Sequence, residues 1–187
     1  PGEVVLVSLE YVFIDDCSNR FLKTFWEKAT TSGRLASFFY DRTPQSLPDF
    51  VRWCRSGSNL PYFVGLKGEL LAMCALNSAR GRTAWGHFCV LSCGVRRYEG
   101  MPLQIAICVG MLAQWLYARN GKEFALDRVL GSTPMTNRAA VKAVHLMGGH
   151  DVATIPGSCF IFQEDRCVDG LVTEHTRLTV PVSGLDL

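Results

Sequence analysis

The sequence predicts a mixed α/β (α+β) fold, with a mostly antiparallel sheet flanked by helices in the order β-α-α-β-β-β-α-β-α-β-β. Three observations predict it. Residues 62–93 hold apolar runs separated by short Gly-containing turns, as in an antiparallel meander. Residues 101–120 are apolar on nearly all sides, which is typical of a buried helix. From residue 127 to 180, strand and helix patterns alternate, as in strand–helix–strand crossovers.

The first part of the chain predicts a strand and two helices. β-Branched apolar residues open it and indicate a buried strand, and Ser18 then offers an N-cap for a helix. The aromatic segment 35–40 has no periodicity that assigns it to a helix or a strand. The expected elements are a strand at 3–13, a helix at 20–30 and a helix from Ser46 or Pro48 to Arg55.

The middle and end of the chain follow the same rules. Gly-containing turns at 67–68 and 80–82 separate the meander strands, and glycines end the two later helices. The expected elements are strands at 62–67, 69–79 and 83–93, a helix at 101–120 before Gly121, a strand at 127–132, a helix at 136–147 before Gly148, and strands at 151–162 and 168–180.

Length and charge narrow the class of protein. The 187 residues, 48% of them hydrophobic, suit a single domain spanning residues 1–187, with its core at 3–180 and a tail at 181–187. A net charge of +2, with one tight basic pair at Arg96-Arg97, argues against a nucleic-acid partner. The apolar run at 101–118 is at the lower length limit for a membrane span and contains Gln104 and Gln114, so no membrane association is expected.

The eight cysteines indicate a compartment rather than a disulfide framework. Most lie in apolar runs, where free cysteine behaves as a small hydrophobe, and a chain of this length does not need cross-links to fold. Glu3, rather than a positive charge, precedes the apolar start, which argues against a secretory signal. The expected location is the cytoplasm.

The most informative segment joins the third meander strand to the long helix. It reads Val90-Leu91-Ser92-Cys93-Gly94-Val95-Arg96-Arg97-Tyr98-Glu99-Gly100-Met101-Pro102. A short loop that opens into a helix gathers backbone N–H groups in one concavity, and the helix N-terminus adds partial positive charge. With Arg96 or Arg97 beside it, this pattern indicates a pyrophosphate site. The alternative is a plain strand-to-helix turn with solvated arginines.

With these elements in this order, the chain resembles the GNAT (GCN5-related N-acetyltransferase) superfamily over residues 3–180. Residues 97–102 match that family's Q/R-x-x-G-x-G/A loop except at Pro102, which lacks an N–H and stands where Gly or Ala is usual. Asn137-Arg138-Ala139-Ala140 matches the family's helix after the fifth strand. His87-Phe88-Cys89 ahead of a short loop also resembles phage- and prophage-borne members.

The resemblance implies an N-acyltransferase that uses acetyl-CoA or another acyl-CoA as co-substrate. An amine, on a small molecule or a protein, would attack the thioester directly in a ternary complex. The pantetheine arm would lie in a V-shaped gap beside the strand ahead of the loop, where a backbone N–H polarises the thioester carbonyl. The residues expected to contact acyl-CoA are Val90, Leu91, Ser92, Cys93, Val95, Arg96, Arg97, Tyr98, Glu99, Gly100, Met101 and Asn137.

His87 is the expected catalytic base. Family members often carry a carboxylate on this strand, but residues 83–93 contain none, and histidine has an ordinary pKa near 6.5. The alternative is a half-buried histidine bonded to backbone. The family's acid, a tyrosine seven residues after the helix Asn, is replaced by Val144, and His145 should point about 100° away. Either Tyr98 or Tyr117 serves instead, or the thiolate leaves unassisted.

Other readings of the sequence remain open. The acceptor entrance is expected to involve Phe38, Phe39, Tyr40, Asp41, Glu174 and His175, although the aromatics could equally be core. His87, Cys89 and Cys93 share one strand parity but have no fourth ligand, so no metal is expected. No motif orients any cysteine as a nucleophile. The resemblance also implies a possible homodimer through residues 168–180.

A rival interpretation gives the same fold another role. Pro102, Val144 and the missing strand carboxylate all favour a catalytically inactive GNAT-like domain that binds CoA or another protein. The two interpretations share the fold and differ in whether acyl transfer occurs.

Overall fold

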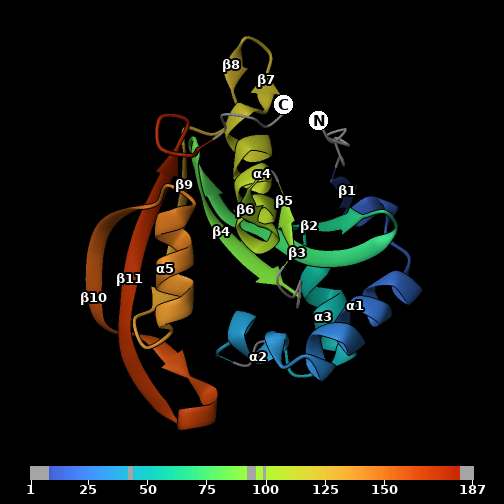
Figure 1. The fold of residues 1–187 in the computed structure, drawn as a ribbon. Helices are drawn as coiled ribbons and strands as arrows, with labels where there is room; N and C mark the ends of the chain where they lie inside the picture. The colour runs from blue at the N-terminus through green and yellow to red at the C-terminus, as the bar shows by residue number, and fades with distance from the viewer. Residues whose placement is uncertain (1–8, 42–43, 92–95, 99, 182–187) are drawn as a thin grey trace.

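The computed structural model describes residues 9–41, 44–91, 96–98 and 100–181. Within these residues, seven strands form one sheet in the order β1-β2-β3-β4-β9-β11-β10, antiparallel throughout except between β4 and β9 (Figure 1). The strands are β1 (Glu10–Phe13), β2 (Asn59–Leu66), β3 (Glu69–Arg80), β4 (Thr83–Val90), β9 (Arg128–Pro134), β10 (His150–Ile161) and β11 (Arg166–Thr176). The helices are α1 (Asn19–Thr31), α2 (Arg34–Phe38), α3 (Leu47–Cys54), α4 (Leu103–Tyr117) and α5 (Arg138–Leu146). The order of the sheet strands and of the other helices agrees with the prediction, and α2 is an additional helix between the two expected ones.

Two apolar clusters hold the helices against opposite faces of the sheet. Under α1, α2 and α3, the rings of Phe25, Phe50 and Phe63 are fully buried and pack within 5.8 Å of one another in the pairs Phe25–Phe50 and Phe25–Phe63. Side-chain oxygens cap two of these helices, because the Ser18 and Ser46 hydroxyls accept from backbone N–H groups in the first turns of α1 and α3. The segment 35–40, which the sequence left unassigned, includes most of α2.

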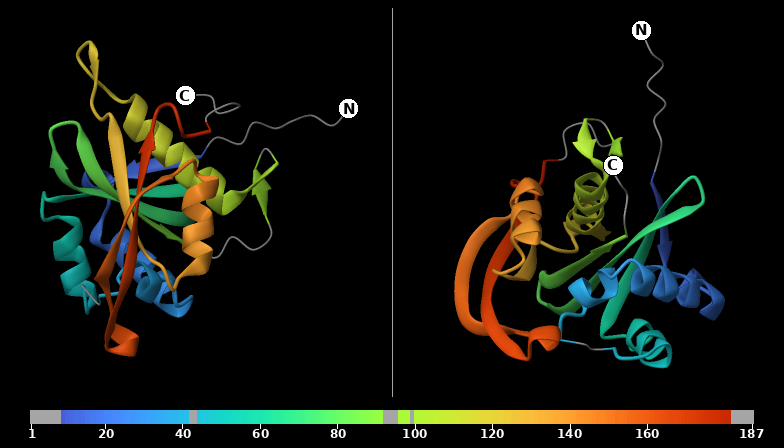
Figure 2. Two further views of the ribbon diagram at one scale, coloured as in Figure 1. Left: turned by 90° about the vertical axis from the view of Figure 1, so that its left-hand side faces the viewer. Right: turned by 60° about the horizontal axis from the view of Figure 1, so that its bottom comes forward.

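On the other face, α4 is buried on nearly all sides, as its composition predicts. It lies between the two halves of the sheet (Figure 2). None of the helices within the described ranges has the length and apolar character that a membrane span needs.

The long helix is shorter than predicted at both ends. Its expected first residues form β6 (Met101–Pro102), which pairs with β5 (Arg97–Tyr98). At the other end β7 (Arg119–Asn120) and β8 (Glu123–Phe124) form a hairpin beyond the helix (Figure 2). Gly121, expected to stop the helix, has φ +63° and turns this hairpin. Arg177 stabilises the early helix end, since its guanidinium donates to the Leu116 carbonyl and lies 4.0 Å from the Phe124 ring centroid.

Two further expectations differ from the structure. The predicted buried strand at 3–13 is described only from residue 9 onward, and there β1 is a sheet edge with Tyr11 37% exposed. The predicted dimer contact at 168–180 falls on β11, which lies between β9 and β10. An edge-to-edge contact in this half of the sheet would therefore use β10.

Strands β4 and β9 pair at only three positions, the last of which joins Trp85 to Leu130. Beyond that pair the two strands diverge (Figure 1). Packing at the junction leaves no room for a side chain at Gly86, because a Cβ there would lie 2.6 Å from a methyl of Val129 and 3.2 Å from the Trp115 ring. The divergence opens the sheet at the centre of the molecule.

Candidate active site

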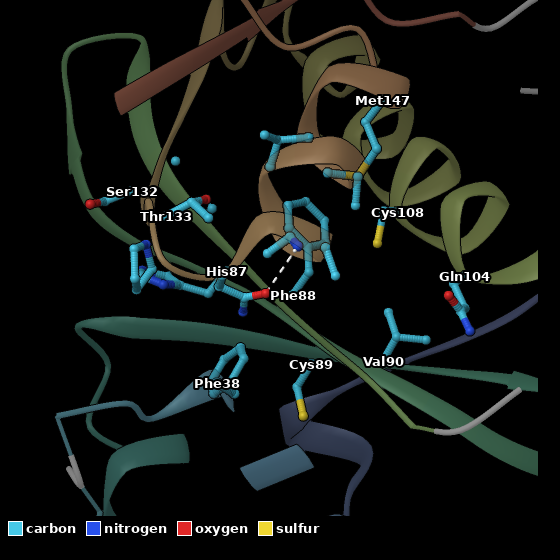
Figure 3. Close-up of a pocket in the computed structure, with 18 of the residues that line it drawn as sticks. Phe38, His87, Phe88, Cys89, Val90, Gln104, Cys108, Ser132, Thr133 and Met147 are labelled. Atoms are coloured by element: carbon cyan, nitrogen blue, oxygen red, sulfur yellow. Dashed lines mark hydrogen bonds between the residues drawn. The ribbon is translucent and has the colours of Figure 1, made fainter. Parts of the chain in front are cut away.

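A cavity of about 320 Å³ lies between the diverging ends of β4 and β9. Its lining residues come from both faces of the sheet, since side chains alternate along each strand. In Figure 3, Cys108 and Met147 lie on one side of β4, and Phe38 and Cys89 lie on the other. The cavity therefore passes through the sheet, from the face covered by α4 and α5 to the face covered by α2.

His87 lines this cavity on the α2 face. The Phe38 ring packs edge-on against the imidazole, with 6.1 Å between ring centroids. The buried Nε2 atom of His87 has no hydrogen-bond partner in the described part of the chain. Burial lowers the pKa of His87 below 6.5, and the negative charge of Asp41 offsets part of that effect. The imidazole is therefore neutral at pH 7 and has the protonation state that a base needs.

A second polar group on the α2 face, the Tyr40 phenol, brings together three segments that lie far apart in the sequence. The Tyr40 phenol is hydrogen-bonded to Ser132 of β9, and the Cys159 thiol of β10 lies 3.9 Å from the phenol oxygen. Burial, together with Cys159, raises the pKa of Tyr40 to about 12, so the phenol keeps its proton. The backbone N–H of Phe162 donates to the Tyr40 carbonyl over 2.9 Å. The sequence indicated Tyr40 but gave no local signal for Ser132 or Cys159.

Asn137 lines the cavity at the start of α5. Its Oδ1 accepts a hydrogen bond from the Ala140 N–H over 3.1 Å and so caps the helix. The side-chain NH₂ group is the part of Asn137 that can bind a ligand. The cap and the ligand contact are thus compatible.

The expected loop contacts are only partly described. Ser92, Cys93, Val95 and Glu99 lie outside the described residues, and of Tyr98 only the backbone is described. Val90 lines the cavity, whereas Leu91 is buried with its N–H donating to the Leu71 carbonyl of β3. Neighbouring N–H groups of a strand point to opposite edges, so the Val90 N–H faces the gap.

The two loop arginines bind within the protein. Arg96 forms an ion pair with Glu69 at 2.7 Å, and Arg97 donates to the Gly100 carbonyl. Both arginines, Gly100 and Met101 lie near the start of α4 but do not line the cavity. The Arg96 carbonyl accepts from the Leu103 N–H over 3.0 Å, so the first N–H of the helix is already used.

The other candidates separate into two groups. Phe38, Tyr40 and His175 line the cavity, whereas Phe39 is buried in the cluster beneath α1 and α3. Glu174 lies 3.6 Å from Arg128 in an ion pair. Tyr117, one of the possible acids, donates to the Arg177 carbonyl outside the cavity. Among the described residues no three His, Cys, Asp or Glu side chains gather as metal ligands, and Cys93 lies outside them.

Comparison with known proteins places the fold. Spermidine N-acetyltransferase from Vibrio cholerae, solved with CoA and spermine, superimposes with a TM-score of 0.69 over 91% of this chain and 96% of its own, at 11% identity. RimL, a ribosomal L7/L12 alpha-N-protein acetyltransferase, gives a TM-score of 0.70 over 93% and 94% of the two chains, at 11% identity. The chain has the GNAT fold.

Other comparisons agree with this fold. YncA from Salmonella typhimurium, solved with its cofactor acetyl-CoA, matches 90% of this chain and 93% of its own with a TM-score of 0.61 and 13% identity. No protein-family model and no curated protein sequence matches the chain. The support for the GNAT fold is therefore the order and geometry of the helices and strands. The resemblance to phage-borne members is still a prediction.

Proposed function

We propose that this chain is an acyl-CoA-dependent N-acyltransferase that moves an acetyl or other acyl group onto an amine. The observation that carries the proposal is the cavity through the sheet, which two substrates could reach from opposite faces and which His87 lines on the α2 face. Solved proteins of the same fold were crystallised with CoA, acetyl-CoA and spermine, which supports an acyl-CoA donor and an amine acceptor.

The donor enters from the face of α4 and α5. Its pantetheine arm follows the free edge of β4, where the Val90 N–H faces the gap and can polarise the thioester carbonyl. The NH₂ group of Asn137 donates to the same ligand from α5. Arg96 and Arg97 lie near the start of α4 and supply positive charge to the pyrophosphate if their present partners release them.

The acceptor enters from the α2 face. Its nitrogen attacks the thioester carbon, the carbon–sulfur bond breaks, and Nε2 of His87 takes the proton that the amine loses. The Tyr40 phenol is a protonated hydroxyl on this side of the cavity, but with a pKa of about 12 it acts as a hydrogen-bond donor rather than an acid. The thiolate therefore does not take a proton from Tyr40.

Ligand binding gives the first test. Acetyl-CoA at a hundredfold its dissociation constant should stabilise the protein by about 2.7 kcal/mol, measured as a rise in melting temperature. Ala140→Trp, which fills the cavity side of α5, should abolish the shift, whereas Lys142→Trp on an exposed position of the same helix should keep it. Absence of any shift with acetyl-CoA, CoA and longer acyl-CoAs would favour the inactive, protein-binding interpretation.

The two roles of Asn137 can be separated. Asn137→Ala should lower the free energy of unfolding by about 1 kcal/mol, because the Ala140 N–H loses its acceptor. Asn137→Ser keeps a capping oxygen and loses the NH₂ group. We expect Asn137→Ser to preserve stability in urea denaturation and to weaken acetyl-CoA binding by roughly fivefold. Unchanged acetyl-CoA affinity in both variants would mean that Asn137 only caps α5 and does not bind the ligand.

A cytoplasmic location, a single domain and a homodimer stay predictions.

A further inference from the structure

Arg34, the first residue of α2, lines the cavity on the side where the acceptor enters. The Cys89 thiol of β4 donates to the Arg34 carbonyl over 4.0 Å, and Cys89 lies on the same side of β4 as Phe38 (Figure 3). Burial raises the pKa of Cys89 to about 12, and the positive charge of Arg34 offsets part of that rise. The Arg34 side chain is exposed, but its charge therefore acts on the lining of the cavity.

The guanidinium of Arg34 has no partner in the part of the chain that the structure describes. Most described arginines form an ion pair or donate to a carbonyl. Arg20, Arg34, Arg80 and Arg138 do neither with any described residue. Of these four described arginines, only Arg34 lines the cavity. Its planar guanidinium is thus available to an anionic group of a ligand, and it binds carboxylates through two parallel hydrogen bonds.

An opposite charge follows the other end of α2. Burial lowers the pKa of His87, and the negative charge of Asp41 offsets part of that effect, so Asp41 lies close enough to act on the imidazole. His87 and Cys89 are two residues apart on β4, so their side chains leave the same face of the strand about 7 Å apart. The acceptor side therefore presents a negative charge beside His87 and a positive charge beside Cys89.

These two charges select the chemistry of the acceptor. An amino group is protonated in solution at pH 7, so it is attracted to Asp41 and reaches His87, which takes its proton. A carboxylate a few bonds from that nitrogen would pair with Arg34. A second ammonium group, as in a polyamine, would be repelled by Arg34. An amine without a second charge would gain nothing from Arg34.

We propose that the acceptor is a free amino acid, with its amino group beside His87 and its carboxylate paired with Arg34. A short amino acid with hydrogen bonds of about 3 Å at its two ends spans the spacing between His87 and Cys89 along β4. This assignment rests on the proposed function and specifies its acceptor.

Matched acceptors test the assignment. Transfer from acetyl-CoA to the twenty common amino acids, to their carboxamides and to spermidine is followed as release of CoA. We expect Arg34→Gln to lower kcat/KM roughly tenfold for the best amino acid and by less than about twofold for its carboxamide, because only the carboxylate pairs with the guanidinium. Each acceptor is compared between the two chains, so the difference in basicity between amino acid and carboxamide cancels.

Three further variants distinguish charge from fold. Arg34→Lys retains the positive charge and should restore part of the preference for the carboxylate. Arg34→Glu reverses the charge and should raise kcat/KM for spermidine relative to the amino acid by at least about tenfold. Arg80→Gln is the matched control, since Arg80 is an exposed arginine at the end of β3 that does not line the cavity. It should leave transfer to every acceptor unchanged.

The outcomes separate this assignment from the proposed function. An equal fall for the amino acid and its carboxamide in Arg34→Gln would overturn the assignment and leave the proposed function intact. Transfer by the natural chain to spermidine in preference to every amino acid would have the same meaning. Absence of transfer to all these amines would overturn the assignment, and acyl-CoA binding would stand if acetyl-CoA still raised the melting temperature. Absence of both transfer and that rise would overturn the proposed function as well.

Discussion

Replacement of His87 by Gln is expected to lower kcat by roughly 10²–10⁴-fold, with the dissociation constant of acetyl-CoA unchanged within about twofold. His87 lines the cavity with a neutral imidazole whose Nε2 has no hydrogen-bond partner among the described residues, and glutamine of similar size cannot accept the proton. The measurement is steady-state transfer to an amine acceptor, together with calorimetry of acetyl-CoA binding.

The pH profile provides a second readout for the same group. Transfer needs the neutral imidazole, so kcat/KM should fall as pH drops through the pKa of His87. Burial places that pKa below 6.5, and the acid limb should therefore have its midpoint below pH 6.5. Asp41→Asn removes the charge that raises this pKa, so the midpoint should move to lower pH still.

Two results would contradict the role of His87. One is a His87→Gln enzyme with unchanged kcat, which would return His87 to the alternative of a packed strand histidine. The other is an acid limb that persists unmoved in His87→Gln, which would assign the titration to another group. His145→Gln is the matched control, because its imidazole lies outside the cavity and pairs with Asp151 at 2.7 Å.

Local patterns in the sequence predicted most of the fold. Apolar runs and turn glycines located the meander, and Ser18 marked the start of α1 as an N-cap. The start of α3 was predicted at Ser46 or Pro48, and the structure shows Ser46 as the cap. The predicted end of α4 was wrong because a residue distant in the sequence determines where the helix ends. Arg177 donates to the Leu116 carbonyl and packs against the Phe124 ring. No local pattern near Gly121 contains that information.

Residues of the candidate site could be predicted only where a pattern within one strand or one helix contains them. The resemblance placed a base on the strand at 83–93, and the absence of a carboxylate there pointed to His87, while the match to the family's helix pattern pointed to Asn137. Ser132 and Cys159 reach Tyr40 from β9 and β10, and their meeting depends on how the two halves of the sheet splay. That angle follows from packing at Gly86, Val129 and Trp115, which the sequence shows only as separate residues.

The largest loss of stability is expected for Gly148→Ala, at the end of α5. Gly148 has φ +82°, and a Cβ there would collide with the Thr179 carbonyl oxygen and lie 3.2 Å from Pro181. The left-handed backbone costs about 1–2 kcal/mol for alanine, and the collision with backbone adds roughly 1–3 kcal/mol. We expect a total of about 2–5 kcal/mol in urea denaturation, with weaker acetyl-CoA binding because α5 lines the cavity.

Gly121→Ala separates the cost of the left-handed backbone from the cost of the close contact in Gly148→Ala. Gly121 has φ +63°, but a Cβ there would meet nothing within 4 Å, so only the backbone cost of about 1–2 kcal/mol should apply. The difference between the two variants measures the close contact that seals the end of α5 against the turn after β11. Equal losses would mean that the Thr179 turn moves aside at little cost, and that α5 is held over the cavity by its own side chains instead.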